Sequence, residues 1–446
     1  MRKTIDDRNI GYSITRRDFL WMTSMSAAGI MTGCATNPVT GKSQIMLVSK
    51  ETEIQIDQQY SPHQISSDYG ILQDKALNNY ISKTGMKIAA KTHRLDMPYN
   101  FKGVNATYVN AYAFPGGSIA ATRGILLSLD NEAELAALLG HELGHVNARH
   151  TAERMSKGMV IQTVVGGLAA LAGTQGSGVG ELAGALGMLG AGALLASYSR
   201  DNERQADELG MEYMVRAGYD PNGMIGLMDV LNNLSKHNPN VIELMFATHP
   251  MSSERYKTAA DRLEAKYKNA NKNRFYKERY KDNTARLRAK RKAIENIQKG
   301  EKEMAGKKYG SAETYFKNAL KKAPKDYAGL LMMSKCQLMQ DKNSEARQYA
   351  EKAKAVYPKE AQAYHLCGFA KIKQKKYESA YEDFKSYEKK LPGNPNTTFF
   401  KGYSLEGMKR NKEAAEEYYK YLQSVKQGEN AKHAYQRLVD WGYIKP

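Results

Sequence analysis

The sequence predicts two folds in series: a mostly helical α+β domain with a small sheet, followed by an all-α solenoid. Residues 101–119 alternate short β-prone pieces with a Phe-Pro-Gly-Gly breaker, which is typical of a strand pair that turns over at glycines. Leucines and a valine then recur at helical spacing down one face of residues 135–146. A third observation, a repeat with a period of 34 residues, predicts the solenoid.

The repeat fills residues 293–446, and its four registers keep their spacing without an insertion. Small residues recur near the middle of the first helix and at the start of the second, and an aromatic or small residue follows four positions on. This pattern is the tetratricopeptide signature, in which stacked helix pairs bury a face that no single pair could bury. Residues 431–443 are expected to form a closing cap helix.

Residues 1–33 are predicted to be an export signal. Arg16 and Arg17 precede an uncharged stretch of small residues that is too short to span a bilayer comfortably. The arginine pair is similar to a twin-arginine signal, and the four residues ending at Cys34 are similar to a lipobox, whose cysteine is acylated after cleavage. Cys34 is therefore the predicted lipid anchor, in the outer membrane of a bacterium; a plain signal peptide with an incidental cysteine is the alternative. The mature chain, with a lead segment at residues 34–50, is placed in the periplasm.

The formal charge of +19 lies entirely in the C-terminal part of the 446-residue chain. Residues 271–446 hold 40 Lys and Arg against 21 Asp and Glu, whereas residues 1–270 hold 26 of each kind. Residues 271–292, dense in Lys and Arg, are predicted to form a basic helical connector. The charge suits acidic protein segments or anionic head groups. Nucleic acid is disfavoured as a partner, because the chain is exported and its lysines are spread through every repeat.

Two features leave alternatives open. Residues 158–196 contain one charge and many glycines, which is typical of two apolar helices joined by a flexible loop. We favour a hairpin packed on the first domain over a transmembrane hairpin, because each arm has only about 18 residues. Cys336 and Cys367 lie on the first helices of adjacent repeats, where a disulfide and two inert buried thiols are equally compatible with the sequence.

His141-Glu142-Leu143-Gly144-His145 is the sharpest chemical signal, and it lies inside a predicted helix. Residues four apart share a helix face, so both imidazoles can bind one metal ion with Glu142 beside it. Zinc suits two neutral imidazoles and a carboxylate, and a fourth position left to water makes such a site catalytic. Glu142 could then take a proton as water attacks an amide carbonyl. The alternative is a chance match of a short pattern.

A second predicted helix offers the missing carboxylate. Glu203 could be the third metal ligand, while Asp207, four residues on, could accept the free N–H of a ligating histidine. On its own this charged segment would be interpreted as a solvated helix face. His150, five residues after His145, is expected to point away from the metal if the helix continues.

These motifs, together with residues 110–117 and 248–250, resemble the HtpX-like and CAAX-protease family of zinc metallopeptidases. The resemblance implies a gluzincin-type zincin fold over residues 51–270. It also implies that one zinc ion per chain is bound by three protein ligands, with a glutamate as general base. The ligands are His141, His145 and Glu203, and the base is Glu142.

The same resemblance singles out two later residues. His249 could fill the open zinc position in a resting form or steady the oxyanion, and Arg255 could hold a substrate carbonyl or the tetrahedral intermediate. A capped loop histidine and a surface arginine are the alternatives. Residues 110–121 could supply an edge strand that pairs with the main chain of an extended substrate.

With the repeats added, the chain resembles the periplasmic members of the family that act as protease and chaperone in outer-membrane assembly. The resemblance implies a lipid-anchored zinc endopeptidase that degrades unfolded or misassembled envelope proteins. Its repeats would recruit these substrates or the outer-membrane β-barrel assembly machinery. The alternative is a chaperone or scaffold in which the protease site is latent.

Overall fold

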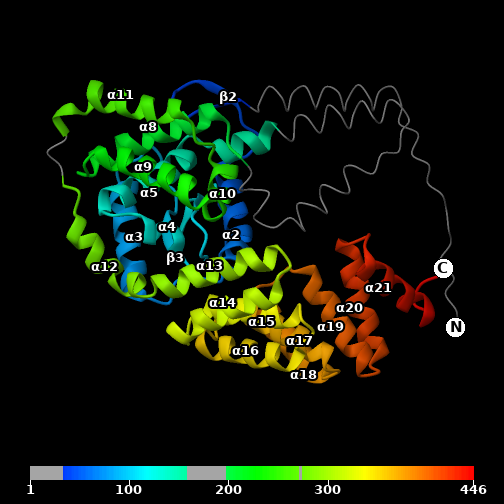
Figure 1. Ribbon diagram of the computed structural model, residues 1–446. Helices are drawn as coiled ribbons and strands as arrows, with labels where there is room; N and C mark the ends of the chain where they lie inside the picture. The colour runs from blue at the N-terminus through cyan, green and yellow to red at the C-terminus, as the bar shows by residue number, and fades with distance from the viewer. Residues whose placement is uncertain (1–33, 158–196, 271–273, 446) are drawn as a thin grey trace, which may run out of the picture.

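The computed structural model describes residues 34–157, 197–270 and 274–445. The predicted export signal and the apolar hairpin at residues 158–196 lie outside these residues. Across the described ranges, no helix is both long enough and apolar enough to cross a bilayer. Figure 1 shows the described residues up to 270, in blue to green, beside a chain of helices in yellow to red. These residues up to 270 are called the front part below. The predicted α+β domain followed by an all-α solenoid is confirmed.

A three-stranded sheet with the order β3-β5-β4 lies in the front part. β3 (Asn100–Val104) runs parallel to β5 (Ser118–Thr122), and β4 (Ala111–Ala113) pairs with β5 in the antiparallel direction. The predicted strand pair is therefore β4 and β5, and the chain reverses at Gly117, whose φ of +103° suits glycine alone. A separate two-stranded ribbon precedes the sheet. It pairs β1 (Cys34–Thr36) with β2 (Ser43–Ile45).

Helices make up most of the front part and surround this sheet (Figure 1). They are α2 (Lys50–Ser67), α3 (Lys75–Ala89), α4 (Arg123–Ser128), α5 (Glu132–Asn147), α8 (Arg200–Arg216), α9 (Asn222–His237), α10 (Pro239–Thr248), α11 (Ser253–Lys266) and the short 3-10 helix η2 (Lys268–Ala270).

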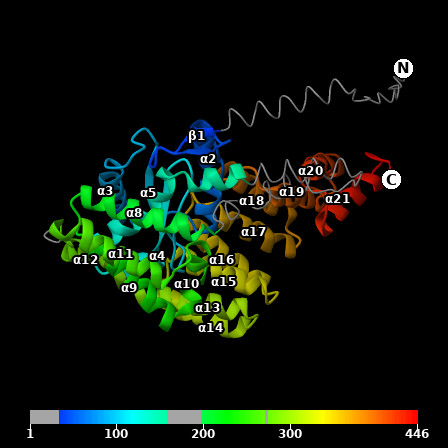
Figure 2. The ribbon, with the colours of Figure 1, turned by 90° about the horizontal axis from the view of Figure 1, so that it is seen from above.

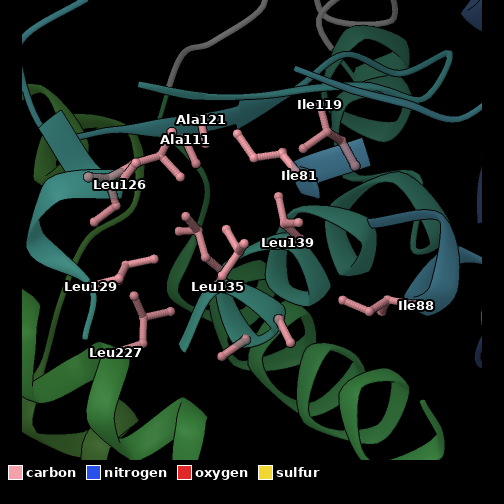
Figure 3. Close-up of a cluster of buried hydrophobic side chains, with 14 of the residues drawn as sticks. Ile81, Ile88, Ala111, Ile119, Ala121, Leu126, Leu129, Leu135, Leu139 and Leu227 are labelled. Carbon is pink, nitrogen blue, oxygen red and sulfur yellow. The ribbon is translucent and has the colours of Figure 1, made fainter. Parts of the chain in front are cut away.

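α5 is the central helix, and all of its residues are buried. Asn131 caps its start, because the Asn131 side chain accepts from the Glu134 backbone N–H at 2.9 Å. Figure 3 shows Leu135 and Leu139 of this helix among side chains from the sheet, α3 and α9. A helix that is buried on every side can hold polar residues only where they have partners. The two histidines and the glutamate of its motif therefore need partners that offset the cost of their burial.

α5 and α8 cross at very short range. A Cβ on Gly140 would lie 2.8 Å from the carbonyl oxygen of Gly210, and a Cβ on Gly144 would lie 2.8 Å from Cα of Ala206. Any larger residue at these glycines would push the helices apart. The close crossing brings the face of α5 that carries His141 and His145 against the face of α8 that carries the predicted carboxylates.

The helical array consists of four helix pairs and a cap, as the four sequence registers predict. In three pairs a glycine of the first helix lies against an aromatic ring of the second: Gly300 on Phe316, Gly368 on Phe384 and Gly402 on Tyr418. Cys336 and Cys367 are both free and buried, so the second alternative holds for them. The helices are α13 (Arg291–Ala305), α14 (Tyr309–Lys322), α15 (Tyr327–Leu338), α16 (Asn343–Val356), α17 (Gln362–Lys373), α18 (Tyr377–Lys390), α19 (Pro395–Gly407), α20 (Asn411–Ser424) and α21 (Glu429–Asp440).

The predicted connector forms α12 (Lys277–Ala289), which packs on the front part. Its Tyr280 and Leu287, with Ile294 of α13, belong to the same buried cluster as α5. Figures 1 and 2 both show α13 beside the front part, ahead of the remaining array.

Polar contacts reinforce this boundary between the front part and the array. The guanidinium of Arg123 donates to both carboxylate oxygens of Asp326, at 2.7 and 3.2 Å, and each side chain is 3% exposed. Ser66 also donates to Glu360, and the Tyr69 hydroxyl donates to Glu301 at 2.9 Å. The two folds therefore share a buried and specific interface.

Candidate active site

The structure brings the three predicted metal ligands together at the crossing of α5 and α8. His141 Nε2 and His145 Nε2 are 3.1 Å apart. Glu203 lies across from both, with one oxygen 3.5 Å from His141 Nε2 and the other 3.3 Å from His145 Nε2. His249, which follows α10, joins them, with its Nδ1 3.3 Å from His141 Nε2 and 3.0 Å from Glu203. All four side chains are buried.

These spacings fit a tetrahedral metal ion. Nitrogen and oxygen ligands lie about 2.0–2.1 Å from zinc, so neighbouring ligand atoms of a tetrahedron are about 3.3–3.4 Å apart. The separations among the three imidazole nitrogens and the two oxygens of Glu203 scatter around this value. Burial also lowers the pKa of His145 well below its usual range, which keeps the imidazole neutral as ligation requires. The donor set of two or three imidazoles and one carboxylate is typical of zinc.

The predicted carboxylate–imidazole contact is also present. Asp207 Oδ1 lies 2.9 Å from His141 Nδ1, and accepts the N–H there when Nε2 faces a metal. Asp207 is held in turn by Arg255, whose Nε and one terminal nitrogen each lie 2.7 Å from its oxygens. The other terminal nitrogen of Arg255 lies 2.6 Å from Glu203 and 3.0 Å from the Pro250 carbonyl. Arg255 is therefore a buried ion-pair partner of two site carboxylates, and the surface-arginine alternative is wrong.

Glu142 lies on the rim of this donor cluster, with one oxygen 3.8 Å from His249 Nε2. Neither of its buried oxygens has a hydrogen-bond partner among the described residues. Burial raises the pKa of Glu142, and the nearby His249 and His141 only partly oppose that shift. A carboxylate with free lone pairs and a raised pKa can both take up and release a proton, which is the property a general base needs.

Sequence reasoning missed two residues that touch His145. The phenol ring of Tyr198 stacks on its imidazole, with centroids 3.8 Å apart and planes inclined by 23°. His150 is not among the clustered donor atoms, as expected, but its Nδ1 lies 2.9 Å from His145 Nδ1. The helical pattern does not reveal this contact, because Arg149 has a left-handed φ of 60° and turns the chain back. The sequence offers one indication of Tyr198: it directly precedes Ser199, the residue that caps the start of α8.

Comparison with known proteins agrees with this geometry. Residues 75–263 match the model of peptidase family M48, and residues 303–368 match a tetratricopeptide repeat model. The beta-barrel assembly-enhancing protease of Yersinia pestis is 32% identical over 202 residues, which cover 45% of this chain and 41% of that protein. The protein of the same name from Escherichia coli K12 is 28% identical over 230 residues, which cover 51% and 47%. Metalloprotease YcaL of that strain is 31% identical over 189 residues, which cover 42% and 66%.

The matched segment thus spans less than half the length of the two beta-barrel assembly-enhancing proteases. The family resemblance predicted from the motifs is confirmed, since the M48 match contains the whole His141–His145 motif, Glu203 and His249. The predicted tetratricopeptide repeats are confirmed as well.

Proposed function

We propose that this chain, which joins an M48 metallopeptidase domain to tetratricopeptide repeats, is a zinc endopeptidase of the bacterial envelope that degrades unfolded or misassembled envelope proteins. The observation that carries the proposal is the tetrahedral spacing of the buried donor atoms next to an unpartnered Glu142. His141, His145 and Glu203 are the proposed ligands. Zinc bound there supplies a Lewis acid for a peptide carbonyl.

Glu142 is the proposed general base. It takes a proton from the attacking water and passes it to the leaving amine, a transfer that suits a buried carboxylate with a raised pKa. Asp207 fixes the N–H of His141, and Arg255 holds both Asp207 and Glu203. Because the donors of Arg255 already face these carboxylates, we propose that it positions the ligands, in place of the contact with a substrate carbonyl.

β4 is the proposed platform for the substrate main chain. Thr122 N donates to Asn110 O, and Phe114 N donates to Ser118 O, so the even-numbered residues of this stretch face β5. The N–H and C=O groups of Ala111 and Ala113 therefore point to the opposite edge of the strand. Ala111 and Ala113 are 0% and 4% exposed, so this proposal requires the groups that cover the edge to move aside. An extended peptide then pairs through its backbone, which makes few demands on its sequence and suits a quality-control protease.

His249 favours a second candidate function, that of a chaperone or scaffold whose protease site is latent. Its Nδ1 lies at the fourth corner of the donor set, where water or substrate would have to enter. We propose that this is a resting arrangement and that His249 must swing away before cleavage. In that case His249→Ala raises cleavage of an unfolded protein several-fold, whereas a role beside the oxyanion predicts a loss instead.

The main test compares the intact chain with Glu142→Gln. We expect one zinc per chain in both, with casein cleavage reduced at least about 100-fold in the variant, because the metal ligands stay while the base is lost. Glu208→Gln, a partly exposed glutamate of α8, is the matched control and should cleave normally. One zinc per chain without cleavage by either protein would favour the latent-site alternative. Absence of zinc from the intact chain would overturn the proposal.

Periplasmic location and the lipid anchor at Cys34 are part of the same proposal. The signal pattern before Cys34 supports them, as does the similarity to proteases named for β-barrel assembly. The repeats are proposed to recruit envelope proteins or the β-barrel assembly machinery. Cys34→Ser should release the protein from the membrane fraction into the soluble periplasm without loss of its zinc. Continued sedimentation with membranes would contradict the anchor.

A further inference from the structure

The two ligating histidines of the proposed zinc site are supported in different ways. His141 has a carboxylate behind it, Asp207, in the arrangement the sequence suggested. His145 has no carboxylate at its Nδ1 among the described residues. There it meets a second imidazole, that of His150, with the two Nδ1 atoms 2.9 Å apart. At this distance one hydrogen lies between the two nitrogens, and one nitrogen donates while the other accepts.

The direction of that hydrogen bond decides whether His145 can bind a metal. If His145 Nδ1 donates, its Nε2 has a free lone pair, which faces His141 Nε2 and Glu203. If His150 donates instead, a neutral His145 carries its proton on Nε2 and cannot ligate. His150 must therefore accept at Nδ1 for the site to work.

Gln205 sets this direction from the far side of His150. His150 Nε2 lies 2.9 Å from Gln205 Oε1, and an amide oxygen can only accept a hydrogen bond. Nε2 of His150 therefore carries its proton, which leaves Nδ1 of the neutral ring as an acceptor. A relay results in which Gln205 orients His150 and His150 orients His145. Gln205 lies on α8, two residues after the ligand Glu203.

The backbone that presents His150 is itself anchored. α5 ends at Asn147, and the left-handed Arg149 turns the chain so that a new helical stretch starts at His150. The guanidinium of Arg149 donates to the Val48 carbonyl at 2.6 Å and to Glu53 at 3.2 Å. Glu53 is fully buried in α2. His150 itself is 2% exposed, so its ring has little freedom to leave His145.

We propose that His150 is a positioning residue of the metal centre, which holds His145 in the tautomer and orientation that ligate zinc. This inference rests on the proposed function, since it takes His145 as a zinc ligand. Hydrogen-bond partners of this kind typically change metal affinity 10- to 100-fold when they are removed. His150 differs from a catalytic residue because it touches neither the ion nor the substrate.

The test measures zinc affinity of the full chain by competition with a chromophoric chelator, which needs no protease activity. His150→Leu keeps a side chain of similar bulk but no acceptor, and should weaken zinc binding by about 10- to 100-fold. His150→Asn places an amide oxygen near the former Nδ1 position, and should retain affinity to within about threefold. His365→Leu is the matched control, because the buried Nδ1 of His365 has no hydrogen-bond partner among the described residues. It should leave zinc affinity unchanged.

The outcomes separate this inference from the proposed function. If the wild-type chain binds zinc and folded His150→Leu binds it equally well, His150 has no positioning role. The same conclusion follows if His150→Asn is as weak as His150→Leu, because the acceptor is then not what matters. A second readout is the visible spectrum of the cobalt-substituted chain, which should shift for His150→Leu and be restored for His150→Asn. Failure of the wild-type chain to bind zinc would instead overturn the proposed function.

Discussion

Two clusters of metal-ligating side chains occur in the described parts of the molecule, and they have opposite characters. One is the set His141, His145, Glu203 and His249. The other lies in the array, where Glu351, Cys367 and Asp383 of three consecutive helices place their ligand atoms just as close together. Proximity alone would make both of them metal sites.

The two clusters differ in how cationic side chains contact their ligand atoms. In the array, Lys354 Nζ lies 2.7 Å from one oxygen of Asp383, and Lys371 Nζ lies 2.6 Å from the other. The Cys367 thiol donates to Glu351 at 3.0 Å, and burial raises its pKa, so it stays protonated and cannot ligate. At the α5–α8 crossing the nearest cation, Arg255, contacts one oxygen of Glu203 and leaves the imidazole lone pairs free. The difference teaches that a metal site requires unused lone pairs as well as close ligands.

The largest effect is expected when one carboxylate of each cluster is replaced by an amide. Glu203→Gln should remove zinc from the chain and reduce casein cleavage about 1,000-fold or more, because a neutral amide is a poor third ligand. Asp383→Asn, the matched change in the array, should leave one zinc per chain. Metal analysis after gel filtration measures both. Loss of zinc from Asp383→Asn would mean that the two clusters had been assigned the wrong way round.

The next effect concerns stability. Lys371→Met leaves a buried oxygen of Asp383 without its ammonium partner and should lower the free energy of unfolding of the array by about 2 kcal/mol. Lys385→Met, which removes an exposed pair with Glu382, should change it by less than about 0.5 kcal/mol. Urea unfolding followed by circular dichroism compares the two variants. Equal stability would show that the lysine contacts contribute little.

The smallest effect is a pH dependence. Burial tends to raise the pKa of Glu351, but the hydrogen bond from Cys367 and the charges of Lys354 and Lys371 outweigh it and lower the pKa to about 2. The charged form is thus favoured by folding, and its contribution is complete above the ordinary value of 4.5 and lost as the pH falls toward about 2.

For a side chain that is 44% exposed, this contribution is about 1 kcal/mol after solvent screening. Glu351→Gln should therefore flatten the acid limb of the stability curve slightly, while stability at pH 7 falls by the same small amount. A steeper acid limb in the variant would contradict this assignment. Thermal unfolding between pH 2 and pH 7 measures the curve.

Much of the site was visible in the sequence because it depends on helical spacing. The four-residue steps from His141 to His145 and from Glu203 to Asp207 fix which side chains share a face. The 34-residue period likewise predicts the array, since small residues must recur wherever two helices approach closely.

What could not be predicted depends on breaks in regularity and on contacts between distant segments. The left-handed Arg149 brings the His150 ring against His145, and no helical pattern reveals such a residue. The ion pairs of Arg255 join helices about 50 residues apart along the chain. The sequence also predicted α12 as a basic connector from its charge. Its apolar Tyr280 and Leu287 pack it on the front part, where Arg279 also pairs with Glu132 and Arg288 donates to the Leu129 carbonyl.

The two folds share part of one hydrophobic core, which bears on whether they can be separated. If the array blocked the cleft, deleting residues 291–446 should increase peptide cleavage. That deletion would also remove Ile294 from the cluster around α5 and expose apolar side chains that it covers. Exposing apolar surface to water costs folding free energy. The first helix of the array is therefore packed into the same hydrophobic core as α5, and a cut before residue 291 should destabilise the part that remains.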